Sequence, residues 1–282
     1  MRTWAGWTVA ALGIGAIGAS SLVAALSGRG LRYTADSMDT IPWWQPWAPV
    51  VAGLLVTLAV PARNAADGAD GADGAEAPPD PRPQAWILLA CGVAFAAGLI
   101  VLGPEEPTYT VLKLALLLAV PAAVFALDRR WGRRWPDPTS RPGWRPVPAV
   151  IAYLVVYLAL SDRSENFLAG VPLLDAVLLL LVGFAMNALL EEVFYRRWLL
   201  TRWHAVLGPW AAVALSAVVW ASWHVAIQGS GAPLPDAMNV LANQGVSGLF
   251  LGFLWLRYRV MWPLLVIHGV WNANPLQFLA GA

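Results

Sequence analysis

Three apolar stretches in the second half of the sequence carry ionisable side chains that could do chemistry together. The first contains Asn187, Glu191, Glu192 and Arg196. Residues four apart lie on one face of an α-helix, so Asn187 shares a face with Glu191. The two adjacent carboxylates are then about 100° apart around the helix axis. The spacing therefore predicts an ion pair between Glu192 and Arg196, with Glu191 pointing elsewhere. The alternative is that both glutamates pair with Arg196 and Arg197.

The second and third stretches each add a histidine. His224 follows Trp220 by four residues, and Gln228 comes one turn later. His268 and Asn272 are also four apart, so an imidazole and an amide project from one helix face. A single histidine in an apolar helix is more often a hydrogen-bonded core residue. Three helices that place polar groups at a similar depth instead favour one functional cluster.

The types of these side chains limit the chemistry that they could support. The sequence has no H-E-x-x-H motif and no glycine-rich phosphate loop, and no buried aspartate completes a triad with Ser216 or Ser222. A glutamate can take a proton from water, while histidine and asparagine can donate to a developing oxyanion. Alternatively, one glutamate and two histidines can hold Zn²⁺ and a water. Both routes activate water and therefore indicate hydrolysis.

Long apolar runs must position these residues. The chain is 59% apolar and only 12% charged, whereas soluble domains carry about 25% charged residues. Because a bilayer core about 30 Å thick needs about 20 apolar residues per helix, we predict an all-α, polytopic transmembrane bundle of about eight or nine spans. The candidate spans lie near residues 4–27, 46–62, 85–103, 110–127, 147–161, 173–200, 209–228, 237–256 and 261–279. The second and fifth are short.

Arginine placement predicts the orientation of these spans. Arginines concentrate at the N-terminus and in the even-numbered loops, and positive residues stay on the cytoplasmic side of a membrane. We therefore expect a multi-pass protein of the cell membrane, with a cytoplasmic N-terminus and an external C-terminus. The net charge of +1 argues against a nucleic-acid partner, which would call for a basic stripe or a high pI.

Two polar segments divide the chain. Residues 65–83 are repetitive and poor in apolar side chains, which predicts a disordered loop. Residues 128–146 are basic and rich in Trp and Pro, which predicts a cytoplasmic linker that contacts lipid headgroups. The linker separates accessory transmembrane helices in residues 1–127 from the region 147–282, which contains the polar cluster.

The spans before this linker contain few polar side chains that could take part in a reaction. Lys113 is the only charged residue in the first four spans, and it lies near a helix end. We expect its long side chain to reach the headgroup region. The single cysteine, Cys91, sits in an apolar run and is expected to be a buried, inert thiol. Charge inside the later spans is different, because it costs about 2.5–3.5 kcal/mol per residue at the bilayer centre.

The polar motifs resemble those of the CAAX prenyl protease and bacteriocin-processing intramembrane endopeptidases, also called the abortive-infection domain family. That family has EExxxR, FxxxH and HxxxN motifs in this order. The matching segments are Glu191-Glu192-x-x-x-Arg196, Trp220-x-x-x-His224 and His268-x-x-x-Asn272. Tryptophan takes the place of phenylalanine in the second motif, an aromatic for an aromatic.

The resemblance implies a peptidase domain over about residues 147–282. Glu191 would activate the water with the help of His224. His268 and Asn272 would stabilise the oxyanion of the tetrahedral intermediate.

The resemblance also implies supporting roles. Glu192 and Arg196 would form a structural ion pair. In a metal-dependent reaction, Glu191, His224 and His268 would hold Zn²⁺, whereas a glutamate mechanism needs no metal. The expected partners are the lipid bilayer and a peptide or membrane-protein substrate that enters from the cytoplasmic half.

Two other functions are compatible with the sequence. A non-catalytic membrane immunity or scaffold protein could keep the same fold. A proton-coupled transporter could use Glu191 and the two histidines as a relay, although no inverted repeat is detectable.

Overall fold

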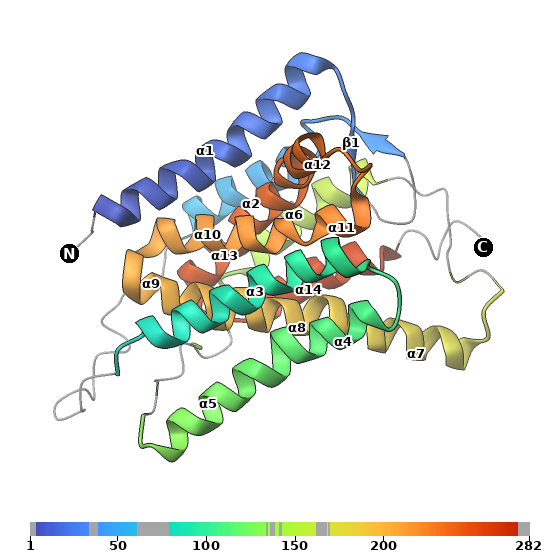
Figure 1. The fold of residues 1–282 in the computed structure, drawn as a ribbon. Helices are drawn as coiled ribbons and strands as arrows, with labels where there is room; N and C mark the ends of the chain where they lie inside the picture. Colours follow the sequence, from blue (N-terminus) through green and yellow to red (C-terminus); the bar gives the residue numbers. More distant parts are fainter. Residues whose placement is uncertain are drawn as a thin grey trace.

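The protein is described by a computed structural model that covers residues 4–33, 39–60, 79–133, 135, 139–140, 143–161, 168 and 170–275. Within these residues the chain forms a bundle of 9 continuous helices (Figure 1). The only strands among them are two short antiparallel ones, β1 (Leu31–Arg32) and β2 (Thr40–Ile41). The predicted helical bundle is therefore confirmed, with one small β-ladder after the first helix.

Five of the nine helices consist of one α-helical segment each. They are α1 (Trp4–Ser27), α2 (Trp47–Ala59), α3 (Arg82–Leu102), α6 (Val147–Leu160) and α14 (Trp262–Asn272). The other four are composite, and three of them contain π-helical segments, labelled η. Their segments are α4 (Thr108–Leu114), η2 (Ala115–Ala119) and α5 (Val120–Arg130); α7 (Leu173–Gly183), η3 (Phe184–Leu189), α8 (Leu190–Glu192), η4 (Val193–Leu200) and α9 (Thr201–Leu207); α10 (Pro209–Ser222) and α11 (His224–Gln228); and α12 (Pro233–Val240), η5 (Leu241–Gly245) and α13 (Val246–Tyr258).

Six of these helices are long and apolar enough to cross a membrane. Helices α2 and α6 are shorter, as predicted for the second and fifth spans. The last helix ends at Asn272 rather than near residue 279. Pro275 follows closely, and the residue before a proline avoids helical backbone angles, so the helix stops early. The chain is thus a multi-pass helical protein, and the orientation of its spans stays a prediction.

The outer surface of the bundle is apolar. Leu26, Val101 and Leu173 are 79%, 78% and 81% exposed. Such a surface would be unfavourable in water, where contiguous apolar patches are small. In a bilayer the same side chains contact lipid. Cys91 is buried and unpaired, as expected.

The polar segments lie largely at the limits of the described chain. Of the predicted disordered loop, residues 65–78 lie outside the described residues, while Arg82 already begins α3. Pro83 suits this position, because the first turn of a helix does not use the missing N–H. Of the predicted linker, residues 128–130 complete α5.

Helix α10 lies near the centre of the bundle and contacts α1, α3 and α13. Its contact with α13 is close at Gly248, where an added Cβ would lie 3.1 Å from the Cα of Ala217 and 3.1 Å from the Trp220 ring. Small residues let membrane helices approach each other in this way. The glycine therefore sets the distance between α13 and Trp220.

Replacement of Gly248 is expected to destabilise the bundle. Gly248→Leu should lower the free energy of unfolding by about 1–3 kcal/mol, because the side chain would push against backbone. Gly18→Leu is the control, since a Cβ at Gly18 meets nothing within 4 Å. Unfolding of both variants in detergent checks this, and equal loss in the two would contradict the packing argument.

Candidate active site

The two adjacent glutamates lie on the short segment α8, which has π-helical segments on both sides. A π-helical segment inserts extra residues into a helix and is frequent at functional sites. Glu191 and Glu192 are 1% and 0% exposed. The helix therefore delivers two carboxylates to the interior of the bundle, each of which needs a partner.

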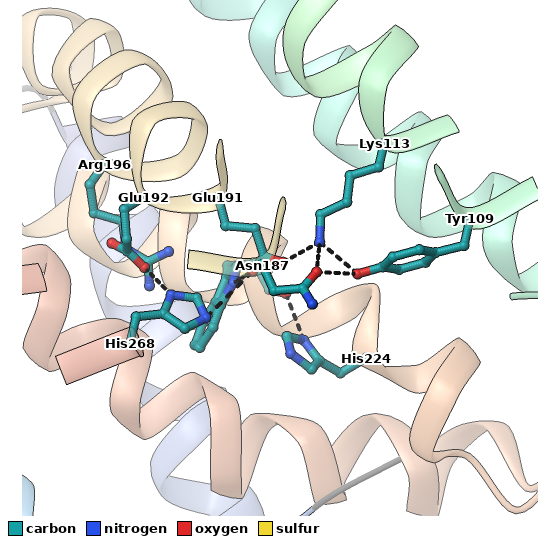
Figure 2. Close-up of polar contacts among 9 residues, drawn as sticks. Tyr109, Lys113, Asn187, Glu191, Glu192, Arg196, His224 and His268 are labelled. Atoms are coloured by element: carbon teal, nitrogen blue, oxygen red, sulfur yellow. Dashed lines mark hydrogen bonds and ion pairs between the residues drawn. The ribbon is translucent and has the colours of Figure 1, made fainter. Parts of the chain in front are cut away.

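Glu191 is held through both carboxylate oxygens (Figure 2). Its Oε1 accepts a hydrogen bond of 2.6 Å from Lys113 Nζ, and its Oε2 accepts one of 2.6 Å from Trp220 Nε1. The prediction that Glu191 points away from Arg196 is confirmed. The alternative, in which both glutamates pair with neighbouring arginines, is wrong.

Lys113 does not reach the headgroup region, contrary to expectation. Its side chain is 0% exposed, and besides Glu191 it contacts Asn187 Oδ1 at 2.8 Å and Tyr109 Oη at 2.6 Å. The position near a helix end suggested a surface role. The carboxylate partner lies 78 residues further along the chain, a separation that no local pattern reveals.

Glu192 binds two basic side chains. The Nε atom of Arg196 lies 3.3 Å from its Oε2, which confirms the predicted ion pair. Its Oε1 accepts a hydrogen bond of 2.7 Å from His268 Nδ1, a contact that sequence reasoning missed. The Arg196 guanidinium also lies 4.5 Å from the Trp220 ring, within the range of a cation–π contact.

These contacts fix which nitrogen of each histidine carries hydrogen. His268 Nδ1 faces a carboxylate oxygen, and His224 Nδ1 faces the Trp220 carbonyl oxygen at 3.1 Å. Both oxygens only accept hydrogen bonds, so Nδ1 is the donor in each ring. In a neutral imidazole, Nε2 is then a free acceptor. His268 Nε2 lies 4.0 Å from Glu191 Oε2.

Trp220 is the central contact of the cluster. Its ring centroid lies 5.1 Å from that of His224 and 5.6 Å from that of His268. Its N–H holds Glu191 and its carbonyl oxygen orients His224. By its sequence position, Trp220 is an aromatic substitute for the phenylalanine of the FxxxH motif. The signal for its role was the indole N–H, which phenylalanine lacks.

Asn272 does not join the cluster. Its side chain is exposed, and it makes no side-chain hydrogen bond within the described residues. It is the last residue of α14, and Ala273 already has non-helical angles of φ −145° and ψ 75°. The spacing of four residues places His268 and Asn272 on one face of α14, but only His268 is buried beside the glutamates.

Comparison with known families supports the resemblance. Residues 173–274 match the family described as type II CAAX prenyl endopeptidase, Rce1-like. They form an Rce1-like domain. The domain contains all three polar motifs. Comparison of the chain with curated proteins and with solved structures gives no match.

The Rce1-like domain does not supply every residue of the cluster. Tyr109 and Lys113 lie on α4, before the matched segment. The domain alone therefore lacks the cation that neutralises Glu191.

The donor atoms of the cluster do not fit a metal site. In the metal-dependent alternative, Glu191, His224 and His268 would hold Zn²⁺. An ammonium already lies 2.6 Å from Glu191 and would repel a second cation. Among the residues that the structure describes, no three His, Cys, Asp or Glu side chains could hold a metal ion together.

Proposed function

We propose that the Rce1-like domain is an intramembrane endopeptidase that activates a water between Glu191 and His268. The supporting observation is the 4.0 Å separation between Glu191 Oε2 and His268 Nε2. A polar contact of this length is suited to one bridging water. Both atoms can accept hydrogen bonds, so the two O–H groups of a water can donate to both.

The proposed reaction begins with general-base catalysis. Glu191 takes a proton from the water while the water oxygen attacks the carbonyl carbon of the peptide bond. The electron pair of the carbonyl moves to its oxygen, and the proton passes to the leaving amine when the C–N bond breaks. Glu192 orients His268 through its Nδ1, much as a carboxylate orients a catalytic imidazole.

His224 is the proposed relay for the proton that Glu191 takes from the water. The two imidazoles flank the Glu191 carboxylate from different sides (Figure 2). Because Nδ1 of His224 donates to the Trp220 carbonyl oxygen, Nε2 of the neutral ring can accept this proton and pass it to the leaving amine. Its ring lies 3.9 Å from that of Trp223, which limits its movement.

Loss of the Asn272 side chain is expected to have a small effect. It remains a predicted oxyanion donor, but it is exposed and lies outside the hydrogen-bonded cluster. Asn272→Ala should therefore lower kcat by less than about tenfold, whereas a single oxyanion-hole donor is typically worth about 10²–10³. Steady-state hydrolysis by the two proteins measures this. A loss of the larger size would place Asn272 in contact with the reacting carbonyl.

Peptide hydrolysis by the purified full chain in lipid vesicles tests the proposed function. The probes are two fluorogenic peptides of the same sequence, one with a prenylated C-terminal cysteine motif and one without the lipid. We expect cleavage of at least one probe, because the matched family is described as a prenyl endopeptidase. Absence of cleavage of both would contradict the proposal.

A chelator added to the same assay tests the mechanism. Activity should persist, because protein groups alone hold the water. Loss of activity that only Zn²⁺ restores would overturn the mechanism while leaving the peptidase function intact.

The same vesicles separate the other two functions that the sequence allows. A proton-coupled transporter would acidify or alkalinise the lumen without cleaving peptide. An immunity or scaffold protein would do neither, and its biological effect would survive loss of Glu191.

A further inference from the structure

A buried polar cluster joins the accessory helices to the candidate active site. It consists of Tyr109, Lys113, Asn187 and Glu191, and we call it the lysine cluster (Figure 2). Two of its members come from α4 and two from the composite helix α7–α9. Lys113 and Glu191 are 0% and 1% exposed, so their contact is shielded from water.

All three hydrogens of the Lys113 ammonium have acceptors within the protein. An ammonium has three hydrogens, and Lys113 Nζ has three oxygen acceptors at 2.6, 2.8 and 2.6 Å, on Tyr109, Asn187 and Glu191. Tyr109 in turn donates to Asn187 Oδ1 at 3.0 Å. No hydrogen of the ammonium remains for a substrate. Its role is therefore to hold protein groups.

Aromatic rings complete the surroundings of the ammonium. Lys113 Nζ lies 4.7 Å from the centre of the Tyr109 ring and 5.1 Å from that of Trp223. Trp223 packs against His224. The lysine therefore contacts two sides of the candidate site, the carboxylate directly and one imidazole through a tryptophan.

We propose that Lys113 is a positioning residue for Glu191. It binds Oε1 and keeps the carboxyl group charged, so that Oε2 faces His268 at 4.0 Å. Trp220 Nε1 holds Oε2 from the other side. The accessory helices then belong to the catalytic unit, although they lie outside the matched domain. This inference rests on the proposed peptidase function.

The main test is Lys113→Met, which keeps the length of the side chain and removes its charge. We expect kcat to fall by about 100-fold, since misplacement of a reacting group by about 1 Å has effects of this size. KM should change less than twofold, because the lysine has no donor free for the substrate. Val111→Ala on the exposed side of α4 is the matched control and should behave as wild type.

Two further variants keep the test decisive if Lys113→Met does not fold. Tyr109→Phe removes one acceptor of the ammonium but leaves its contact with Glu191, and it should lower kcat without changing KM. Lys113→Arg retains the positive charge and should restore part of the activity lost in Lys113→Met.

The outcomes separate this inference from the proposed function. If the wild type cleaves peptide and folded Lys113→Met has a normal kcat, the positioning role alone is overturned. If Lys113→Met does not fold, a normal kcat in Tyr109→Phe has the same consequence. If the wild type cleaves no peptide, the proposed function fails, and positioning for hydrolysis fails with it. The ion pair can still be measured then: Lys113→Met with Glu191→Gln should be more stable than Lys113→Met alone, because no buried charge is left unpaired.

Discussion

Glu191→Gln is expected to lower kcat for peptide hydrolysis by about 10²–10⁴-fold, the usual contribution of a general base. Glutamine has nearly the same shape, but it cannot take a proton from water. The Lys113 ammonium, 2.6 Å from this residue, would also lose its counter-charge. Rates must therefore be measured on protein shown to be folded, for instance by size-exclusion chromatography and thermal unfolding in detergent.

Asp175→Asn is the matched control for this variant. Asp175 is an exposed carboxylate in the first turn of α7, on the same composite helix as Glu191. Its replacement removes one negative charge without touching the cluster, and activity should stay at the wild-type level. Equal activity in Glu191→Gln and Asp175→Asn would remove Glu191 from the mechanism.

Glu192→Ala is expected to have the largest effect on stability. Glu192 and Arg196 are both 0% exposed, and no guanidinium nitrogen of Arg196 has a hydrogen bond to the described residues. The carboxylate is therefore the main compensation for a buried positive charge. Loss of one partner of a buried pair costs about 3–5 kcal/mol. Unfolding of the protein in mixed detergent micelles would measure the change.

The double variant Glu192→Leu with Arg196→Leu provides the comparison. It removes both charges and fills the space with apolar atoms, which is often neutral for stability. It should be more stable than Glu192→Ala, although His268 would lose its orienting contact. If the single variant is as stable as wild type, the buried charge of Arg196 must be compensated elsewhere.

Local sequence patterns predicted much of this molecule. Hydropathy predicted the nine helices of the described residues, because an apolar segment in a membrane has few alternatives to a helix. The i, i+4 spacing gave the Glu192–Arg196 pair and the separate direction of Glu191. These features depend on residues within one or two helical turns, where geometry is nearly fixed.

Such local patterns could not predict the contacts between helices that are distant in the sequence. The charge partner of Glu191 comes from α4, and the orienting partner of His268 is Glu192, 76 residues earlier. The exposure of Asn272 depends on where α14 ends, which the nearby Pro275 influences. Each of these facts requires knowledge of how helices pack.

The composite helix from Leu173 to Leu207 is 35 residues long. At 1.5 Å per residue it measures about 52 Å, whereas the hydrocarbon core of a bilayer is about 30 Å thick. The helix must therefore tilt strongly or extend beyond the core. Glu191 lies near its middle. A thicker or thinner bilayer would change the tilt, and hydrophobic mismatch would then set the depth at which Glu191 meets a substrate.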